Sequence, residues 1–435
     1  MIPQESFVIV AEVESVQLGE LRSLLKTMTF ADRPGMANPD NPLLRFRDFD
    51  EIHFARFVVL ADNTLNDRAP YRDTYPQLPR SEPTYLCFMV DCDGSADELL
   101  ARMTQKPDGL RKIFDHCKGF DEATDLLGWL RSHEVTPAAS YINWVGRSVG
   151  QVRDEARLHE LLRAALAGIE DEEPQQILVA LRKSVVPPEL KPAPPTPLGW
   201  RNRNLWHLLV PFLIAIVGLV LFPITIPLLF IGSVLFVITL RRHEQTDKFV
   251  KQPYDADWVR ELRTSEDHDV TNQYTAMGSI KPGWFRITTE KAILYAINWF
   301  ARHIFTRGSL ARIGTIHFAH WVLLDQGRRA FFCSNYDGGH EAYMDDFINK
   351  AGFGLNLSFS SGIGYPTTNW LLARGAWLEQ DFKRFQRRHQ IPTDVWYRAY
   401  PGLTAHDLAR NSRIRNGFEK PVMSDDEIRR WLAEI

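Results

Sequence analysis

The chain has 435 residues, with 51 basic and 54 acidic side chains, a formal net charge of −3 and 45% hydrophobic content. This length and composition are typical of two or three packed domains. The charges nearly balance, and the sequence contains no block rich in Lys or Arg. We therefore expect no nucleic-acid partner.

The cysteines and the N-terminal residues indicate the cellular compartment of the protein. The four cysteines have no paired short spacing of the kind that a structural zinc site uses; they are Cys87, Cys92, Cys117 and Cys333. We expect reduced, buried thiols and no metal site. The apolar run from Phe7 to Val13 is short and contains Glu12, which favours a first strand over a signal peptide. The chain is expected to start in the cytosol.

The first part of the chain alternates strand and helix patterns. The predicted elements, in chain order, are a strand at 6–14, a helix at 18–28, a strand at 52–62, a polar surface insertion at 63–82, a strand at 85–90 that ends at Asp93-Gly94, a helix through Leu99 and Met103, and a helix at 152–166. Prolines dominate 187–197 and indicate a stiff linker.

A membrane segment follows the linker. From Leu208 to Leu240, 33 consecutive residues carry no formal charge. One straight helix of that length would be about 50 Å long, against a hydrocarbon core of about 30 Å. Pro223 and Pro227 lie near the middle and would break it. We expect a helical hairpin that either crosses the bilayer twice or dips into one leaflet.

The charges beside this segment predict its orientation. Arg201 and Arg203 precede it, and Arg241, Arg242 and Lys248 follow it. The positive-inside rule therefore favours the cytoplasmic membrane with both soluble halves in the cytosol. The alternative is a single kinked span with the two halves on opposite sides.

Two stretches of the chain match one another and indicate an internal duplication. Residues 52–62 (IHFARFVVLAD) match 316–325 (IHFAHWVLLD), and each leads to a second strand ending in Asp-Gly. The interval from His to Asp is 40 residues in the first copy and 20 in the second. A further block pairs 133–146 with 389–402, with His, Tyr and Gly at the same spacing.

The duplicated unit predicts the fold class. Each copy opens with a strand and a helix, 6–14 and 18–28 in the first and 273–281 and 287–304 in the second. The order βαββα, with a further short strand and helix, is similar to the ferredoxin-like α+β sandwich. Two such repeats are expected to pack sheet on sheet as an intrachain pseudo-dimer. The predicted organisation is a first repeat at 1–180, a proline-rich linker at 181–204, a membrane hairpin at 205–242, a connector at 243–271 and a second repeat at 272–435.

His53 and His317 are candidate ligand-binding residues in the matched strands. Strict alternation would put His53 with Ala55 and Phe57, and Arg56 on the opposite face. A buried histidine with backbone partners is one interpretation; haem or metal ligation and general-base catalysis are the others.

The remaining candidates are Asp93, Asp337, His116, His133 and His389. Asp before Gly at a strand end is typical of a turn that caps the next helix. His133 and His389 follow arginines and either bind an anion or finish a helix. His116 has no histidine counterpart in the second copy, so a site built from it would be complete only in the first half. The aromatic helix at 287–304 either covers the sheet or lies on a membrane surface.

The IHFA(R/H)(F/W) blocks with their Asp-Gly turns resemble an uncharacterised bacterial repeat domain, found in chains that carry haem-peroxidase or lipid-oxidising modules. The architecture is also similar to dye-decolourising peroxidases, whose haem pocket uses the Asp of a GxxDG motif; here Val90–Gly94 and Ser334–Gly338 lack its first glycine. Two functions are therefore considered. One is a membrane-anchored module that binds a lipid, a small apolar molecule or a protein partner; the other is a haem-dependent oxidoreductase with a histidine ligand.

Overall fold

The structure, a computed structural model, describes residues 3–61, 74–79, 81–106, 109–169, 173–189, 196–247, 249 and 255–435. Most of the predicted insertion at 63–82 and part of the predicted linker at 181–204 lie outside the described residues.

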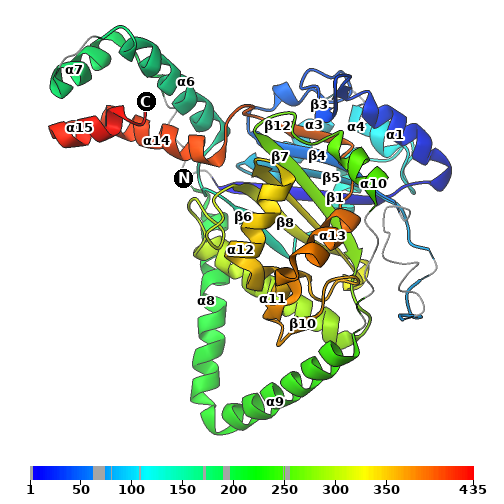
Figure 1. The fold of residues 1–435 in the computed structure, drawn as a ribbon. Helices are drawn as coiled ribbons and strands as arrows, with labels where there is room; N and C mark the ends of the chain where they lie inside the picture. The colour runs from blue at the N-terminus through cyan, green and yellow to red at the C-terminus, as the bar shows by residue number, and fades with distance from the viewer. Residues whose placement is uncertain are drawn as a thin grey trace.

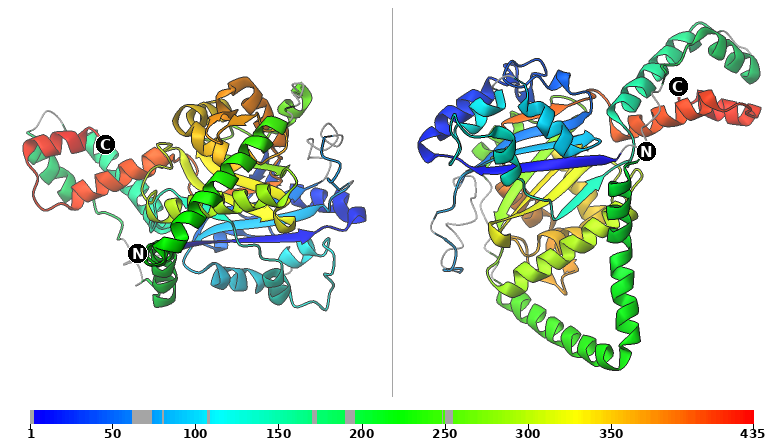
Figure 2. Two further views of the ribbon diagram at one scale, coloured as in Figure 1. Left: turned by 90° about the horizontal axis from the view of Figure 1, so that it is seen from below. Right: turned by 180° about the vertical axis from the view of Figure 1, so that it is seen from behind.

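Two mainly antiparallel sheets pack face to face between two layers of helices (Figures 1 and 2). The first has the order β1 (Gln4–Glu12), β5 (Tyr85–Asp93), β4 (Ile52–Leu60), β12 (Val395–Arg398), β3 (Arg33–Ala37) and β2 (Thr29–Phe30). The second has the order β6 (Ala139–Ile142), β8 (Ile316–Leu324), β9 (Arg329–Asp337) and β7 (Thr271–Ser279). The long strands occur where β-branched and aromatic residues predict them. The fold is α+β, as expected.

The two sheets exchange their short strands. The chain after helix α5 (Leu126–Ser132) runs beside β1, where the Val135 N–H donates to the Val8 carbonyl, and then crosses to pair β6 with β8. The chain after helix α13 (Glu379–His389) does the same beside β7, where the Ile391 N–H donates to the Thr275 carbonyl, and then crosses to pair β12 with β4. Residues 1–180 and 272–435 therefore each supply one strand to the other's sheet.

A β-bulge at the start of β4 and another at the start of β8 change which side chains face which side. The register shifts between Ile52 and Phe54, and again between Ile316 and Phe318. A bulge adds one unpaired residue and breaks the alternation. Arg56 consequently points into the space between the sheets, and His53 also reaches that side, where its ring lies 5.1 Å from that of Phe318. The predicted separation of these two side chains onto opposite faces is wrong for this reason.

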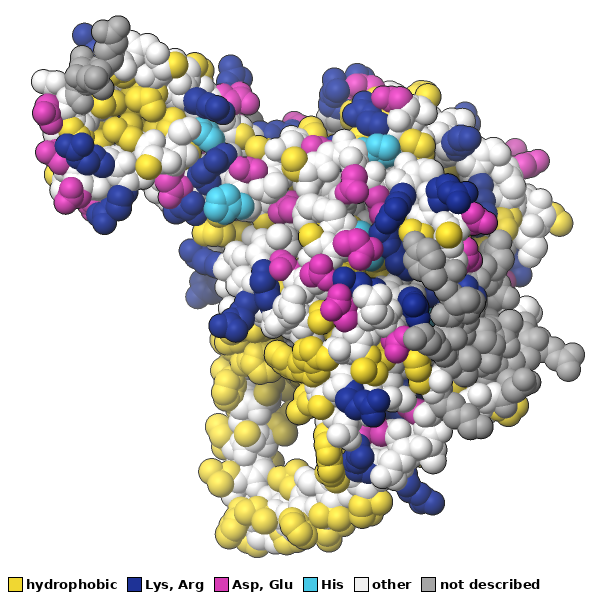
Figure 3. All heavy atoms as spheres, in the orientation of Figure 1, with side chains coloured by type: hydrophobic (Ala, Val, Ile, Leu, Met, Phe, Trp, Pro, Cys, Tyr) yellow, Lys and Arg dark blue, Asp and Glu magenta, His cyan; other side chains and the backbone are white. Residues whose placement is uncertain are grey.

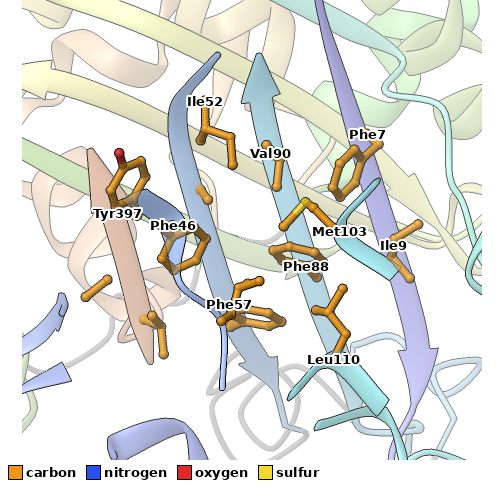
Figure 4. Close-up of a cluster of buried hydrophobic side chains, with 14 of the residues drawn as sticks. Phe7, Ile9, Phe46, Ile52, Phe57, Phe88, Val90, Met103, Leu110 and Tyr397 are labelled. Carbon is orange, nitrogen blue, oxygen red and sulfur yellow. The ribbon is translucent and has the colours of Figure 1, made fainter. Parts of the chain in front are cut away.

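The outer face of the first sheet carries a large apolar core (Figure 4). Phe57 of β4 and Phe88 of β5 stack with ring centroids 4.2 Å apart, and Met103 and Leu110 reach them from covering helices. The helices on this side are α1 (Leu18–Lys26), α3 (Ala96–Thr104), α4 (Gly109–Phe114) and α5 (Leu126–Ser132), with 3-10 turns at Ser15–Gln17 and Phe46–Asp48.

The second sheet is covered by longer helices, α11 (Trp284–His303), α12 (His340–Phe359) and α13 (Glu379–His389). Smaller elements beside them are α10 (Ala256–Arg263), β10 (Thr368–Asn369), β11 (Ala373–Arg374) and 3-10 turns at Asp325–Gly327 and Gly375–Trp377. One face of α11 is buried on the sheet through Glu290 and Leu294, while Trp284 and Phe300 are exposed. The helix therefore covers the sheet, which is one of the two predicted roles, and also presents aromatic side chains on its exposed face.

A helical arm projects away from the sheets (Figure 1). It consists of α6 (Val149–Leu166), α7 (Pro174–Ser184), α14 (Ala405–Glu419) and α15 (Asp425–Leu432). These helices share their own apolar cluster, which includes Leu162, Leu181 and Trp431. The arm matters for the site because α6 and α14 both begin beside the two sheets.

Two helices, α8 (Leu198–Val220) and α9 (Phe222–Thr246), are long and apolar enough to cross a membrane. They meet at Leu221, next to Pro223, where a bend was predicted. No residue of α8 is buried, and the apolar side chains of both helices form a continuous surface below the body (Figure 3). Their far ends contact the body: Trp299 donates to the Leu208 carbonyl, and Glu244 accepts from the Trp370 N–H.

Candidate functional site

Two of the predicted site residues, His53 and Asp93, form a pair at the edge of the space between the sheets. His53 Nε2 is 3.0 Å from Asp93 Oδ1, and its Nδ1 is 3.1 Å from the Tyr400 hydroxyl. The other carboxylate oxygen, Asp93 Oδ2, accepts the Val149 N–H at 2.8 Å. The pair therefore joins β4 and β5 to the first turn of α6.

Two further predicted residues, His317 and Asp337, form a second pair with the same geometry. His317 Nε2 lies 2.7 Å from Asp337 Oδ1, and Asp337 Oδ2 accepts the Ala405 N–H at the start of α14 at 2.8 Å. Each aspartate was expected to cap the helix that follows it in sequence. That expectation is wrong, because Ser95 caps α3 and Gly339 precedes α12, while the crossing segments bring α6 and α14 to the carboxylates. The glycines after both aspartates do adopt the positive φ that the turn requires.

Replacing Asp93 with alanine is expected to lower the free energy of unfolding by roughly 2–3 kcal/mol. The change removes a helix-capping acceptor, worth about 1 kcal/mol, and leaves a buried imidazole without its carboxylate partner. Chemical denaturation of the purified protein measures the loss. The control is Asp97→Ala, because Asp97 is exposed and pairs only with Arg131 on the surface. Equal effects of the two substitutions would contradict the structural role of the pair.

The other predicted histidines do not join these pairs. His116 Nδ1 bonds to the Lys112 carbonyl one turn earlier. His133 directly follows α5 and its Nδ1 bonds to the Trp129 carbonyl; His389 ends α13 and its Nδ1 bonds to the Phe385 carbonyl. For His133 and His389, this is the helix-finishing arrangement that was one of the two alternatives.

Sequence reasoning missed a buried polar chain between the sheets. Ser140 Oγ lies 2.9 Å from His320 Nδ1, His320 Nε2 lies 2.7 Å from Asp91 Oδ1, and Ser6 donates to the same oxygen. Burial alone would raise the pKa of Asp91, but His320, Ser6 and Arg56 outweigh it and hold the pKa below its usual value. His320 is only 1% exposed, so this series of hydrogen bonds links strands rather than facing a substrate. Only knowledge of which strands pair could have shown that these side chains lie together.

An apolar cavity of about 40 Å³ lies between the second sheet and helices α11, α12 and α13. Its walls include Ala276, Gly278, Trp321, Ala330, Phe332 and Phe385. The polar side chains that reach it are Glu290, Ser358, Gln386 and His389. A volume of this size has room for roughly three water-sized groups.

Small residues create this cavity. Corresponding positions of β1 and β7 can be compared directly. The sixth residue is Ile9 in β1 and Ala276 in β7, and the eighth is Ala11 in β1 and Gly278 in β7. In β5 and β9, Leu86 and Ala330 are both second in the strand. At each place the second sheet carries the smaller side chain. At Gly278 a Cβ would lie 2.8 Å from the His389 ring, so the backbone needs glycine there.

One acid faces this apolar space. Burial raises the pKa of Glu290 to about 8, against the opposing effects of Ser361 and Arg286. Glu290 is therefore mostly protonated at neutral pH. Its Oε2 atom has no hydrogen-bond partner among the described residues. A protonated carboxyl in an apolar wall offers one hydrogen bond to a ligand.

The described residues form no metal site, and the apolar cavity does not fit a haem. Among them, no group of three or more His, Cys, Asp and Glu side chains is placed to hold a metal ion. His389 reaches the apolar cavity, but a space for roughly three water-sized groups does not admit a haem macrocycle.

Comparison of the chain with protein-family models, with curated proteins and with solved structures gives no match. The resemblances to the bacterial repeat domain and to dye-decolourising peroxidases stay predictions.

Proposed function

We propose that the protein is anchored in a membrane by α8 and α9 and binds a small apolar group, such as the end of an acyl chain, in the cavity of its second half. The observation that carries this proposal is the apolar cavity beside the two exposed apolar helices. An empty apolar cavity loses packing contacts, and an apolar ligand restores them.

The surface around α8 and α9 supports membrane insertion. Exposed apolar helices of this size are unfavourable in water. Trp206, Trp284, Tyr295 and Phe300 are exposed near the ends of the two helices or along α11, where aromatic residues favour the membrane interface. At the bend, the Thr225 hydroxyl donates to the Gly218 carbonyl at 2.6 Å, which satisfies a polar group that lipid cannot. The flanking arginines favour a cytosolic location for both soluble halves.

Helix α11 connects the lipid to the cavity. It lines the cavity with Glu290 and Leu294. The same helix packs Trp299 on Phe212 of α8 and Phe285 on Phe236 of α9. A molecule in the bilayer beside α8 and α9 is thus one helix away from the binding space.

The proposal includes a duplication of a ferredoxin-like unit in which one copy has become the binding copy. The strand orders β1-β5-β4 and β7-β9-β8, the paired bulges and the two His–Asp pairs support it. The first copy fills with Ile9 and Leu86 the space that the second copy leaves open.

Filling the cavity tests the proposal. Ala276→Ile places in β7 the side chain that β1 already carries. The full-length protein, in lipid nanodiscs, is illuminated with a fatty acid that carries a photoactivatable diazirine at its chain end, and labelled peptides are identified by mass spectrometry. We expect the wild type to be labelled at Trp321 or Phe332, and the variant to lose that labelling at least tenfold. Labelling of α8 and α9 should not change.

Val59→Ile is the matched control, because it adds one methyl group on the outer face of the first sheet, away from the cavity. It should label like the wild type. Cavity labelling that persists in Ala276→Ile, or that is absent from the wild type while α8 and α9 are labelled, would overturn the proposed function.

A further inference from the structure

A second cavity, of about 20 Å³, lies where the two His–Asp pairs approach each other. Five apolar residues line it together with the polar side chains of Gln4, His53, Asn143, Arg147, His317 and Tyr400. It holds one or two water-sized groups. It is separate from the apolar cavity, with which it shares no lining residue.

Arg147 is the unusual residue of this cavity. Its side chain is 3% exposed, and none of its three guanidinium nitrogens has a hydrogen-bond partner among the described residues. The guanidinium lies 4.0 Å from the centroid of the Trp144 ring, and Arg307 lies 5.5 Å from the same centroid. A buried cation without a partner is costly, since burial removes its water and nothing replaces it.

None of the carboxylates nearby forms a hydrogen bond with Arg147 among the described residues. Asp93 and Asp337 are each bound to a histidine and to the first N–H group of a helix. Burial lowers the pKa of Arg147 and the charge of Glu155 opposes this, but Glu155 Oε1 accepts from Gln151 rather than from Arg147. Arg147 also directly precedes Ser148, the N-cap of the 18-residue α6, whose dipole favours an anion there. The guanidinium N–H groups are therefore left without an acceptor.

The backbone around Arg147 is held in place. Gln4 Oε1 accepts the Gly146 N–H at 2.8 Å, and Gln4 Nε2 donates to the Arg147 carbonyl at 2.6 Å. Arg147 thus sits on a fixed segment at the wall of the cavity. Fixing a donor before the ligand arrives lowers the entropic cost of binding.

The matching position in the second half shows that the fold does not need this charge. Arg147 follows Gly146, and Leu403 follows Gly402 at the same place before α14. Leu403 packs against the apolar core. A leucine satisfies the structural role in one half, so the arginine in the other half calls for a ligand.

We propose that this second cavity binds a small oxyanion of carboxylate size, with the guanidinium of Arg147 as its principal partner. A guanidinium presents two parallel N–H donors that fit the two oxygens of a carboxylate. The volume of about 20 Å³ restricts the ligand to a group of a few heavy atoms. This site is independent of the apolar cavity and of the function proposed for it.

Thermal unfolding of the full-length protein in detergent tests this site, with sodium acetate and sodium chloride compared at equal ionic strength. We expect acetate to raise the Tm of the wild type in a saturable way and chloride to have a smaller effect. Arg147→Leu should show an affinity for acetate at least tenfold weaker, and its Tm without acetate should equal or exceed that of the wild type. Arg147→Lys should retain a weakened response.

Arg163→Leu, at an exposed position of α6, is the control and should respond like the wild type. The proposal is overturned if acetate has no saturable effect on the wild type, if chloride acts equally, or if Arg147→Leu keeps the response. It is also overturned if Arg147→Leu and Glu155→Gln lower the Tm equally whether or not acetate is present, since Arg147 would then be paired with Glu155.

Discussion

Replacing Glu290 with glutamine is expected to raise the stability of the protein at pH 8 by roughly 5 kcal/mol, and to leave its stability at pH 4 nearly unchanged. The pKa of Glu290 is about 8 in the folded protein, compared with 4.5 for an unperturbed glutamate. Below pH 4.5 both folded and unfolded states carry the proton. Between pH 4.5 and 8 only the unfolded state ionises, so stability falls by about 1.4 kcal/mol per pH unit. Glutamine cannot ionise and removes that loss.

Denaturant unfolding between pH 4 and pH 9 measures the effect as a change in slope. The control is Glu98→Gln, because Glu98 is exposed on α3 and the substitution is the same. Parallel profiles for the wild type and Glu290→Gln would show that Glu290 is ionised in the folded protein. Glu290 would then place a negative charge in the wall of the apolar cavity, and the cavity would suit a different ligand.

The second large effect is expected from Arg56, which crosses the space between the sheets. Its guanidinium donates to the Tyr274 carbonyl at 3.0 Å, Thr275 Oγ1 at 3.0 Å, the Ser334 carbonyl at 3.2 Å and Asn335 Oδ1 at 2.6 Å. Arg56→Met removes these four hydrogen bonds and leaves the Tyr274 and Ser334 carbonyls without this donor, while Thr275 Oγ1 and Asn335 Oδ1 keep Thr393 and Trp396 as partners. We expect a loss of roughly 3–5 kcal/mol in the free energy of unfolding.

The same denaturation experiment checks this loss, with Arg157→Met as the control at an exposed position of α6. The control should change stability by less than about 0.5 kcal/mol. A loss below 1 kcal/mol for Arg56→Met would mean that the two sheets hold together through apolar contacts alone.

His320 occupies the matching place in β8 and reaches Asp91 in the first sheet, so Arg56 has a counterpart that points the opposite way.

The strands and most helices could be predicted from the sequence because their patterns are local. The IHFA blocks lie in β4 and β8, and the Asp-Gly turns lie at the ends of β5 and β9, where hydrophobic alternation and turn residues indicate them. The hairpin bend was predicted because proline acts on its own helix. The His–Asp pairs were named residue by residue, although not as pairs.

The exchange of strands could not be predicted, because a four-residue strand pairs equally well with either sheet until tertiary contacts decide. The bulges also leave no signal in the composition of β4 or β8. Arg147 was missed for a related reason: its isolation depends on which acids the crossing segments bring close. The apolar cavity did have a signal, since aligning Ile9 with Ala276 and Leu86 with Ala330 would have revealed the missing volume.

The crossing of β12 into the first sheet has a consequence for biosynthesis. On the ribosome, the N-terminal sheet cannot close until residue 398 has emerged, because β12 lies between β4 and β3. The apolar helices leave the ribosome earlier, so under the proposed anchoring they would reach the bilayer while β4 still has an unpaired edge. An open edge of this kind invites pairing with other chains. Early insertion would tether the nascent chain to the bilayer and keep the unfinished sheet near its own C-terminal half.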